Sequence, residues 1–235
     1  MEKIVAIGDC NTLGAGPLER HSYPEVLGQR LGVEVINCGY TMATTREGIH
    51  LLRDNIDGAD CVTIQFGLVD SYTTFRYSPY VLYYPERLWR KPLRHIIKKY
   101  KKVCRQKGLL QRFGQKNVVA PQEYEKNIRQ MLALAWPRRV ILLETIPNHE
   151  QQRNDNIIYY NTILKRISAE YSNCSTVNLY EVFYNNLHHY YLDQTHSNHL
   201  GYECIAERIE DTLKDWLGDR DSNPDKRSQS PPPCH

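Results

Sequence analysis

The sequence predicts an α/β protein, a three-layer α/β/α sandwich around a five-stranded parallel sheet. Short β-branched and apolar runs alternate along the chain with segments of helical periodicity, most of them ten or more residues long. Parallel strands need connections of this length, because a crossover helix must carry the chain back to the same edge of the sheet. Helices that alternate with parallel strands cover both faces of the sheet, and this gives the three layers.

Five runs are expected to form the strands. The first, KIVAI, is rich in β-branched residues and stops at Gly8-Asp9, as a buried strand does when it delivers its next residues to a sheet edge. The five expected strands are 3–7, 33–36, 60–66, 139–143 and 176–179.

Helical periodicity predicts six helices between and after these strands. Gly32 follows the first helix, where a left-handed residue commonly ends one, and Pro92 limits how far the third extends upstream. The expected helices are 24–31, 45–55, 87–103, 122–135, 155–171 and 198–217. Residues 218–235 lack apolar periodicity and contain four Pro, so we expect one domain, 1–217, and a disordered tail.

Composition narrows the class of protein. With 235 residues, 41% of them hydrophobic and 24% charged, the chain is neither a collagen, a wholly disordered chain nor a disulfide miniprotein. The N-terminus lacks the pattern of a signal peptide, and no run approaches 18 apolar residues. Seven Cys, an odd number without a CxxC pair, favour a reduced, cytoplasmic protein without structural zinc.

Charge is distributed unevenly along the chain. The formal net charge is +3, yet residues 71–120 contain thirteen Lys or Arg and a single acid, Glu86. This segment therefore carries +12, and the rest of the chain carries −9. Such an asymmetry bears on the partners of a protein rather than on its fold.

Four segments carry the residues that a site needs. In order they are Gly8-Asp9-Cys10-Asn11-Thr12, Asn37-Cys38-Gly39, Gly67-Leu68-Val69-Asp70 and Asp193-Gln194-Thr195-His196. The first three follow expected strands, and ligands of parallel sheets bind beyond the carboxyl ends of strands. We therefore expect them around one cleft, which the fourth segment can reach from the loop before the last helix.

Together these segments resemble the SGNH (GDSL-type) hydrolase family over residues 1–217. In that family they supply, in this order, the nucleophilic Ser of a GDS motif, a Gly, the Asn of a GxND motif, and the Asp and His of a DxxH motif. The resemblance implies a flavodoxin-like sheet and acyl-transfer chemistry. In this chain the Ser position holds Cys10 and the Asn position holds Val69.

The resemblance implies a Cys-His-Asp triad. Cys10 is the expected nucleophile, His196 the general base and acid, and Asp193 the residue that orients the imidazole. The backbone N–H groups of Cys10 and Gly39 are expected to bind the oxyanion. Val69 cannot donate a hydrogen bond, and the loss of one such donor costs other acyl-transfer enzymes about 10²–10³ in rate.

Three further residues border the expected cleft. We expect Thr12, Val69 and Asp70 to contact the substrate.

The position of Cys10 predicts a lowered thiol pKa. The N–H groups of a following helical turn and a neighbouring imidazole both stabilise a thiolate. A thiolate–imidazolium pair needs less help from a general base than a hydroxyl does. The acyl-Cys10 intermediate would be a thioester, which exchanges readily with thiols and amines and therefore suits acyl transfer at least as well as ester hydrolysis.

Other interpretations of these residues stay open. Cys10 could be an ordinary buried apolar side chain or an engineered replacement of Ser, and Asp193 could simply cap a turn. Asp193, His196 and His199 have acceptable ligand types for a metal site. Nothing else in the sequence supports such a site, and we expect neither a metal nor a cofactor.

The basic segment has an amphipathic pattern. In residues 87–103, apolar side chains recur at three- and four-residue steps and leave a densely cationic opposite face. An aromatic-rich stretch precedes it, so we expect a lid-like insertion at about 71–120 over the cleft. The alternative is a helix whose apolar side covers the core and whose Lys and Arg are merely solvated.

The sequence thus predicts an ester or thioester hydrolase, or an acyltransferase, that acts on a small acylated substrate. The alternative is a catalytically degenerate relative that binds an acylated or glycan ligand. On the basic insertion we expect an acyl-carrier protein or a coenzyme A thioester, or an anionic membrane surface. Nucleic acid is disfavoured, because no recognised binding module accompanies the charge.

Overall fold

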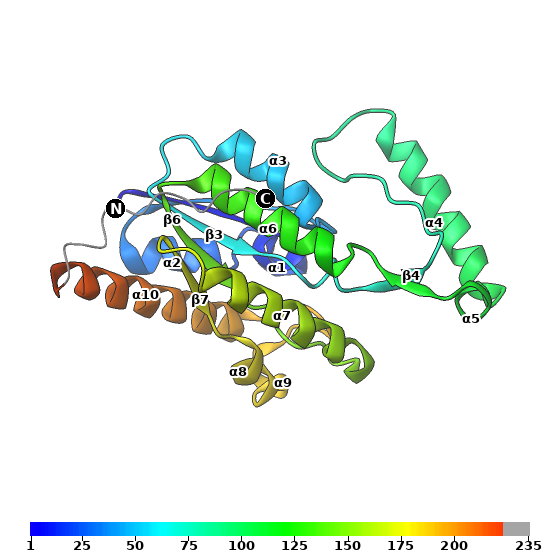
Figure 1. Ribbon diagram of the computed structural model, residues 1–235. Helices are drawn as coiled ribbons and strands as arrows, with labels where there is room; N and C mark the ends of the chain where they lie inside the picture. The colour runs from blue at the N-terminus through cyan, green and yellow to red at the C-terminus, as the bar shows by residue number, and fades with distance from the viewer. Residues whose placement is uncertain (223–235) are drawn as a thin grey trace.

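The computed structural model describes residues 1–222, and a five-stranded parallel sheet forms its centre (Figure 1). Its strand order is β2-β1-β3-β6-β7. The strands are β1 (Lys3–Gly8), β2 (Glu34–Gly39), β3 (Cys61–Gln65), β6 (Arg139–Leu143) and β7 (Cys174–Val177). The predicted fold class is confirmed.

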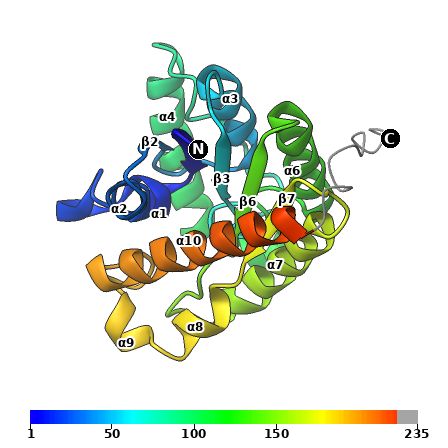
Figure 2. The same ribbon diagram turned by 90° about the vertical axis from the view of Figure 1, so that its left-hand side faces the viewer.

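Helices cover both faces of this sheet, as Figures 1 and 2 show. Those that cover it are chiefly α2 (Tyr23–Leu31), α3 (Thr45–Asn55), α6 (Pro121–Ala135), α7 (Asn154–Ser168) and α10 (His199–Ser222), while the long α4 (Arg90–Gln106) belongs to the basic insertion. The short ones are α1 (Cys10–Leu13), α5 (Leu109–Phe113), α8 (Tyr180–Tyr184), α9 (Leu187–Tyr190), and two 3₁₀ turns, Gly16–Leu18 and Gln151–Arg153. None of the helices within residues 1–222 is long and apolar enough to cross a membrane.

Side chains of strand β1 point alternately into two apolar cores, one on each face of the sheet. Val5 and Ile7 of β1 pack on one face with residues of α3, α6 and α7. Ile4 and Ala6 pack on the other face with residues of α2 and α10. All four side chains are fully buried, which explains why β1 has no polar position after Lys3.

Two glycines let α1 pack directly on the strand ends. A Cβ at Gly8 would lie 2.0 Å from Thr12 Oγ1, and one at Gly39 would lie 2.2 Å from the backbone nitrogen of Leu13. These two glycines are paired in register across β1 and β2. The close approach places the first residue of α1 at the carboxyl edge of the sheet.

The basic insertion rises from a two-stranded ribbon between β3 and α6. β4 (Thr73–Phe75) pairs antiparallel with β5 (Gln115–Asn117), and α4 and α5 lie between them. The sequence did not predict this ribbon, because three-residue strands show no readable alternation. Figure 1 shows α4 standing apart from the helices that cover the sheet.

A buried carboxylate ties the insertion to the core. Glu47 closes a capping box at the start of α3 through Thr44. It also accepts hydrogen bonds from the hydroxyl of Tyr80 and from the backbone N–H of Tyr83, both in the insertion. The aromatic stretch is therefore fixed against α3 by hydrogen bonds to a side chain that solvent does not reach.

Two predicted boundaries at the C-terminal end were wrong. β7 lies two residues earlier than expected, at Cys174–Val177, because the chain turns at Leu179, whose N–H is bound by the buried Glu144. Helix α10 continues to Ser222, so residues 218–222 are not the disordered tail predicted for them. The remainder of that predicted tail, 223–235, lies outside the described residues.

Candidate active site

The site begins where β1 passes into α1. Asp9 is the N-cap of α1, and its carboxylate accepts a hydrogen bond of 2.9 Å from the N–H of Asn11. Cys10 is therefore the first residue of the helix. Its side chain is 9% exposed and packs against Leu68 and Ile157.

The thiol pKa is raised, contrary to expectation. Burial has the largest effect, and the carboxylate of Asp9 adds to it. The N–H groups of Cys10 and Asn11 do stabilise a thiolate, as predicted, but they do not outweigh burial. In the resting protein Cys10 is thus a neutral thiol, and the expected thiolate–imidazolium pair is not its ground state.

Asp193 and His196 form the predicted pair. Asp193 Oδ2 lies 2.8 Å from His196 Nδ1, while Oδ1 accepts hydrogen bonds from the N–H groups of Thr195 and His196. The same side chain therefore caps the turn and orients the ring. Burial opposes ionisation of Asp193, but these hydrogen bonds outweigh it and lower its pKa.

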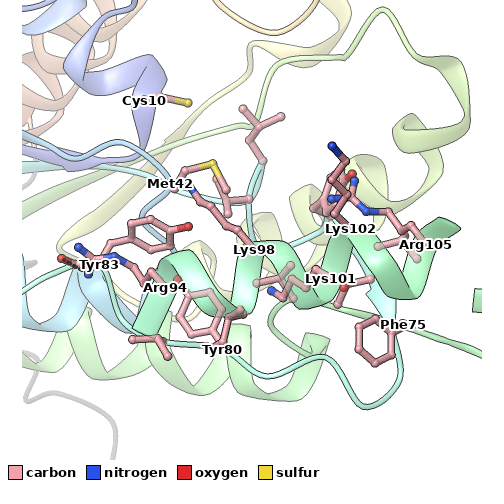
Figure 3. Close-up of a pocket in the computed structure, with 18 of the residues that line it drawn as sticks. Cys10, Met42, Phe75, Tyr80, Tyr83, Arg94, Lys98, Lys101, Lys102 and Arg105 are labelled. Atoms are coloured by element: carbon pink, nitrogen blue, oxygen red, sulfur yellow. Dashed lines mark hydrogen bonds between the residues drawn. The ribbon is translucent and has the colours of Figure 1, made fainter. Parts of the chain in front are cut away.

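Cys10 and His196 line one cavity of about 550 Å³. Leu68, Val69 and Thr195 border it beside them, and Figure 3 shows the Cys10 sulfur directed into the open space. Among the hydrogen bonds of the described residues, none joins the sulfur to the imidazole. With Nδ1 held by Asp193, it is Nε2 that is free to take a proton within the cavity.

Two asparagines that sequence reasoning missed hold the histidine loop in place. The Asn11 side chain accepts from the N–H of Ser197 and donates to the carbonyl of Thr195. Asn148, in the loop after β6, donates to Thr195 Oγ1. The side chain of Asn11 thus joins the first motif to the last. The neighbouring sequence did not indicate that role.

The predicted oxyanion donors are only partly in place. The N–H of Gly39 donates to Asn37 Oδ1 at 2.9 Å, so it is engaged within its own turn. This turn was invisible in the sequence, because an Asn two residues before a Gly is common in loops of any kind. Val69 does line the cavity and offers only apolar surface there.

Two residues expected to contact substrate are structural instead. Thr12 is fully buried, and its hydroxyl donates to Gln65 Oε1. Asp70 is also fully buried and accepts hydrogen bonds from the N–H and hydroxyl of Thr45 at the start of α3. The sequence around Asp70 does not indicate this role, because its partner Thr45 lies 25 residues earlier in the chain.

The alternative metal site is not assembled. His196 Nδ1 is bound to Asp193, whereas His199 Nε2 lies 3.2 Å from Glu203 on α10. Across residues 1–222 no group of three His, Cys, Asp or Glu side chains is arranged to hold a metal ion.

Comparison with known proteins identifies the family. The family model described as GDSL-like lipase/acylhydrolase matches residues 4–209, which include both the Cys10 and the His196 segments. The chain belongs to this GDSL-like family. No curated protein matches it significantly.

Solved GDSL-like structures share the fold. A lipase/acylhydrolase from Enterococcus faecalis is 18% identical, with a TM-score of 0.60, over 91% of this chain and 96% of that one. An acetyl-xylooligosaccharide esterase variant from Geobacillus stearmophilus is 19% identical, with a TM-score of 0.57, over 88% and 92%. The catalytic domain of a peptidoglycan O-acetyltransferase from Streptococcus pneumoniae is 12% identical, with a TM-score of 0.55, over 91% and 93%.

In this GDSL-like protein the basic insertion forms the wall of the cavity opposite Cys10 (Figure 3). Cationic side chains of α4 line the cavity, while Ile96 and Val103 of the same helix are 62% and 46% exposed. These two apolar side chains of α4 therefore do not cover the core, contrary to the interpretation in which the apolar face of this helix does so. The aromatic stretch closes the same wall with Tyr80 and Tyr83.

Proposed function

We propose that this GDSL-like protein is an acyl-transfer enzyme that works through a covalent acyl-Cys10 thioester. The observation that carries the proposal is that the Cys10 sulfur and a His196 ring already oriented by Asp193 line the same cavity. Family membership supports ester or acyl-transfer chemistry in general. The nucleophile and the triad are our assignment.

In the proposed acylation, one proton moves from Cys10 through His196 to the leaving group. Because Cys10 rests as a thiol, His196 Nε2 first takes its proton as general base when substrate fills the cavity. The sulfur then attacks the acyl carbon, an S–C bond forms, and the bond from the acyl carbon to the alcohol or thiol leaving group breaks. The imidazolium returns its proton to that leaving group, while Asp193 stabilises the positive ring.

Deacylation follows the same path in reverse with a new partner. Water, a thiol or an amine gives a proton to His196 and attacks the thioester carbonyl. The S–C bond then breaks, and the imidazolium returns its proton to the sulfur, which restores the Cys10 thiol. The backbone N–H of Cys10, the first residue of α1, is the donor that supports the oxyanion in both steps, because the N–H of Asn11 is already bound to Asp9. Leu68 and Val69 offer an apolar surface to the acyl chain.

Intact-protein mass spectrometry after incubation with activated acyl esters and thioesters tests this proposal. We expect one acyl adduct per chain, mapped by peptide analysis to Cys10 and absent in Cys10→Ala. Cys38→Ala is the matched control, because it removes another free thiol, which lies near the carboxyl end of the neighbouring strand β2, and it should keep the adduct. An adduct that survives in Cys10→Ala, or no adduct with any donor, would contradict the assignment.

A second candidate function is binding without turnover. It is favoured by the missing Asn donor at Val69 and by the Gly39 N–H that is already engaged. In that case the protein would bind an acylated or glycan ligand in the cavity with equal affinity in wild type and Cys10→Ala, and no acyl group would be transferred.

A further inference from the structure

We propose that the α4 wall of the cavity binds a phosphate-type anion on the non-acyl part of the substrate. The inference rests on the proposed function, because it takes the ligand to be the acyl donor or acceptor of that same site. It names the substrate class: a small acylated molecule, or acyl acceptor, that carries phosphate.

A cationic stripe on α4 faces the cavity. Its members occur at positions i, i+3, i+4 and i+7 and therefore share one face of the helix. They are Lys98, Lys101, Lys102 and Arg105, and all four line the cavity on the side opposite Cys10 (Figure 3).

Within residues 1–222 these four cations have no acidic partner. Across the described part of the chain, none of them forms a salt bridge, and no Asp or Glu lines the cavity. Other cations that line the cavity are engaged: Arg94 of α4 donates to the carbonyl of Leu82, and Arg153, outside the insertion, pairs with Glu150. The stripe is thus a set of donors without acceptors.

Keeping these charges together has an energetic cost. Lys101 is half-buried, and its pKa is lowered by burial and by the nearby charges of Lys116 and Arg105. A bound anion would remove that repulsion and supply the missing acceptors. The lowered pKa of Lys101 agrees with its position among the other cations that line the cavity.

The orientation of α4 favours a ligand inside the cavity over a surface partner. Trp89, Ile96 and Val103 are exposed on the outside of the insertion. A membrane would meet that apolar outer surface, and the four cavity cations would face away from it. A small anion that enters the cavity can contact all of them.

The donor set and the size of the cavity fit a phosphate ester. Lysine ammonium groups bind phosphate as point charges, and an arginine guanidinium can bind two of its oxygens at once. A volume of about 550 Å³ lies within the range of small-molecule sites. Such a phosphate could belong to a nucleotide-containing thioester or to a sugar phosphate, and the test below separates the two.

Isothermal titration calorimetry with tripolyphosphate, coenzyme A and glucose 1-phosphate tests the inference. We expect binding by wild type that weakens about tenfold or more in the double variant Lys98→Gln/Lys102→Gln, because each lost charged contact contributes roughly 1 kcal/mol or more. Lys91→Gln/Lys99→Gln is the matched control, since it removes the same charge from exposed positions of α4 that do not line the cavity. It should bind within about twofold of wild type. Preference for coenzyme A or for glucose 1-phosphate identifies the source of the phosphate.

The titrations are repeated in Cys10→Ala to separate this inference from the proposed function. Binding that persists in Cys10→Ala and is lost in Lys98→Gln/Lys102→Gln supports the anion site even if no acyl adduct ever forms. Equal losses in the cavity pair and the control pair would overturn it, because net charge alone would then explain binding. It would also be overturned if none of the three small anions bound, including the case in which only an acidic carrier protein, anionic vesicles or nucleic acid did.

Discussion

The groups around Cys10 have opposite effects on the pKa of its thiol. The helix N–H groups at its position favour a thiolate, whereas burial and the carboxylate of Asp9 favour the thiol, and the second pair prevails. In the proposed mechanism, a thiol kept neutral in this way depends on His196 for its activation. It is also protected from adventitious alkylation and oxidation while the cavity is empty.

The rate of Cys10 alkylation should therefore keep rising with pH. Because the folded-state pKa is raised, the thiolate fraction grows about tenfold per pH unit through pH 7 to 10 without a plateau. Iodoacetamide labelling followed by peptide mapping measures the rate at Cys10. The urea-unfolded chain is the control and should approach its plateau just above a pH of about 8.5. A folded-state plateau below pH 8 would contradict this account.

Among individual residues, the sequence located the candidate catalytic side chains better than the side chains that hold them in place. Cys10, His196 and Asp193 could be predicted because strand ends and a three-residue spacing constrain where they lie. The role of Asn11 could not, because its bonds reach residues 184 and 186 positions away in the sequence. The bond from the Gly39 N–H to Asn37 was missed for a different reason: it depends on the conformation of one turn.

A second pH-sensitive group, Asp70, lies against the start of helix α3. Asp70 is buried beneath it, and desolvation raises its pKa to about 7, although the hydrogen bonds from Thr45 act against this. Among the residues that the structure describes, one oxygen of its carboxylate, Oδ2, has no hydrogen-bond partner. A protonated Asp70 therefore suits the folded state better than the ionised form.

This raised pKa predicts that stability falls as pH rises. The contribution is fully present below the unfolded-state pKa, near 3.8, and is lost as pH rises through the folded-state value of about 7. Asp70→Asn keeps an acceptor for Thr45 and cannot ionise. Between pH 5 and pH 8 the free energy of unfolding should thus fall by about 2–3 kcal/mol more in wild type than in Asp70→Asn.

Urea unfolding at both pH values measures this difference. Asp60→Asn is the control, because the exposed Asp60 has a lowered pKa and stays ionised throughout that range. It should follow wild type. Parallel pH dependences of wild type and Asp70→Asn would show that Asp70 does not titrate as its burial implies.

The predicted boundaries of helices and strands were accurate where the local sequence pattern was strong. Helix α3 begins and ends where predicted, at Thr45 and Asn55, since a capping box and a clear period mark it. The β4–β5 ribbon was missed because strands of three residues carry no period. For α4 the period was correct, but a period gives the two faces of a helix and not the neighbour that each face meets.

For the whole molecule, the parallel sheet was predictable and the position of the insertion was not. Alternating strands and long helices leave few topologies, and the observed order β2-β1-β3-β6-β7 is one of them. The +12 segment was evident from composition, yet composition does not say whether charge faces solvent or a cavity. In the folded chain the part of that charge on one face of α4 borders the space into which Cys10 points.

Turnover of matched ester and thioester substrates measures directly whether catalysis requires the Cys10 sulfur as the proposed nucleophile. The account predicts that wild type turns over both, that Cys10→Ala is slower by about 10³-fold or more, and that Cys10→Ser retains part of the ester activity. Turnover by Cys10→Ala at the wild-type rate, or no turnover by wild type on any substrate, would contradict it.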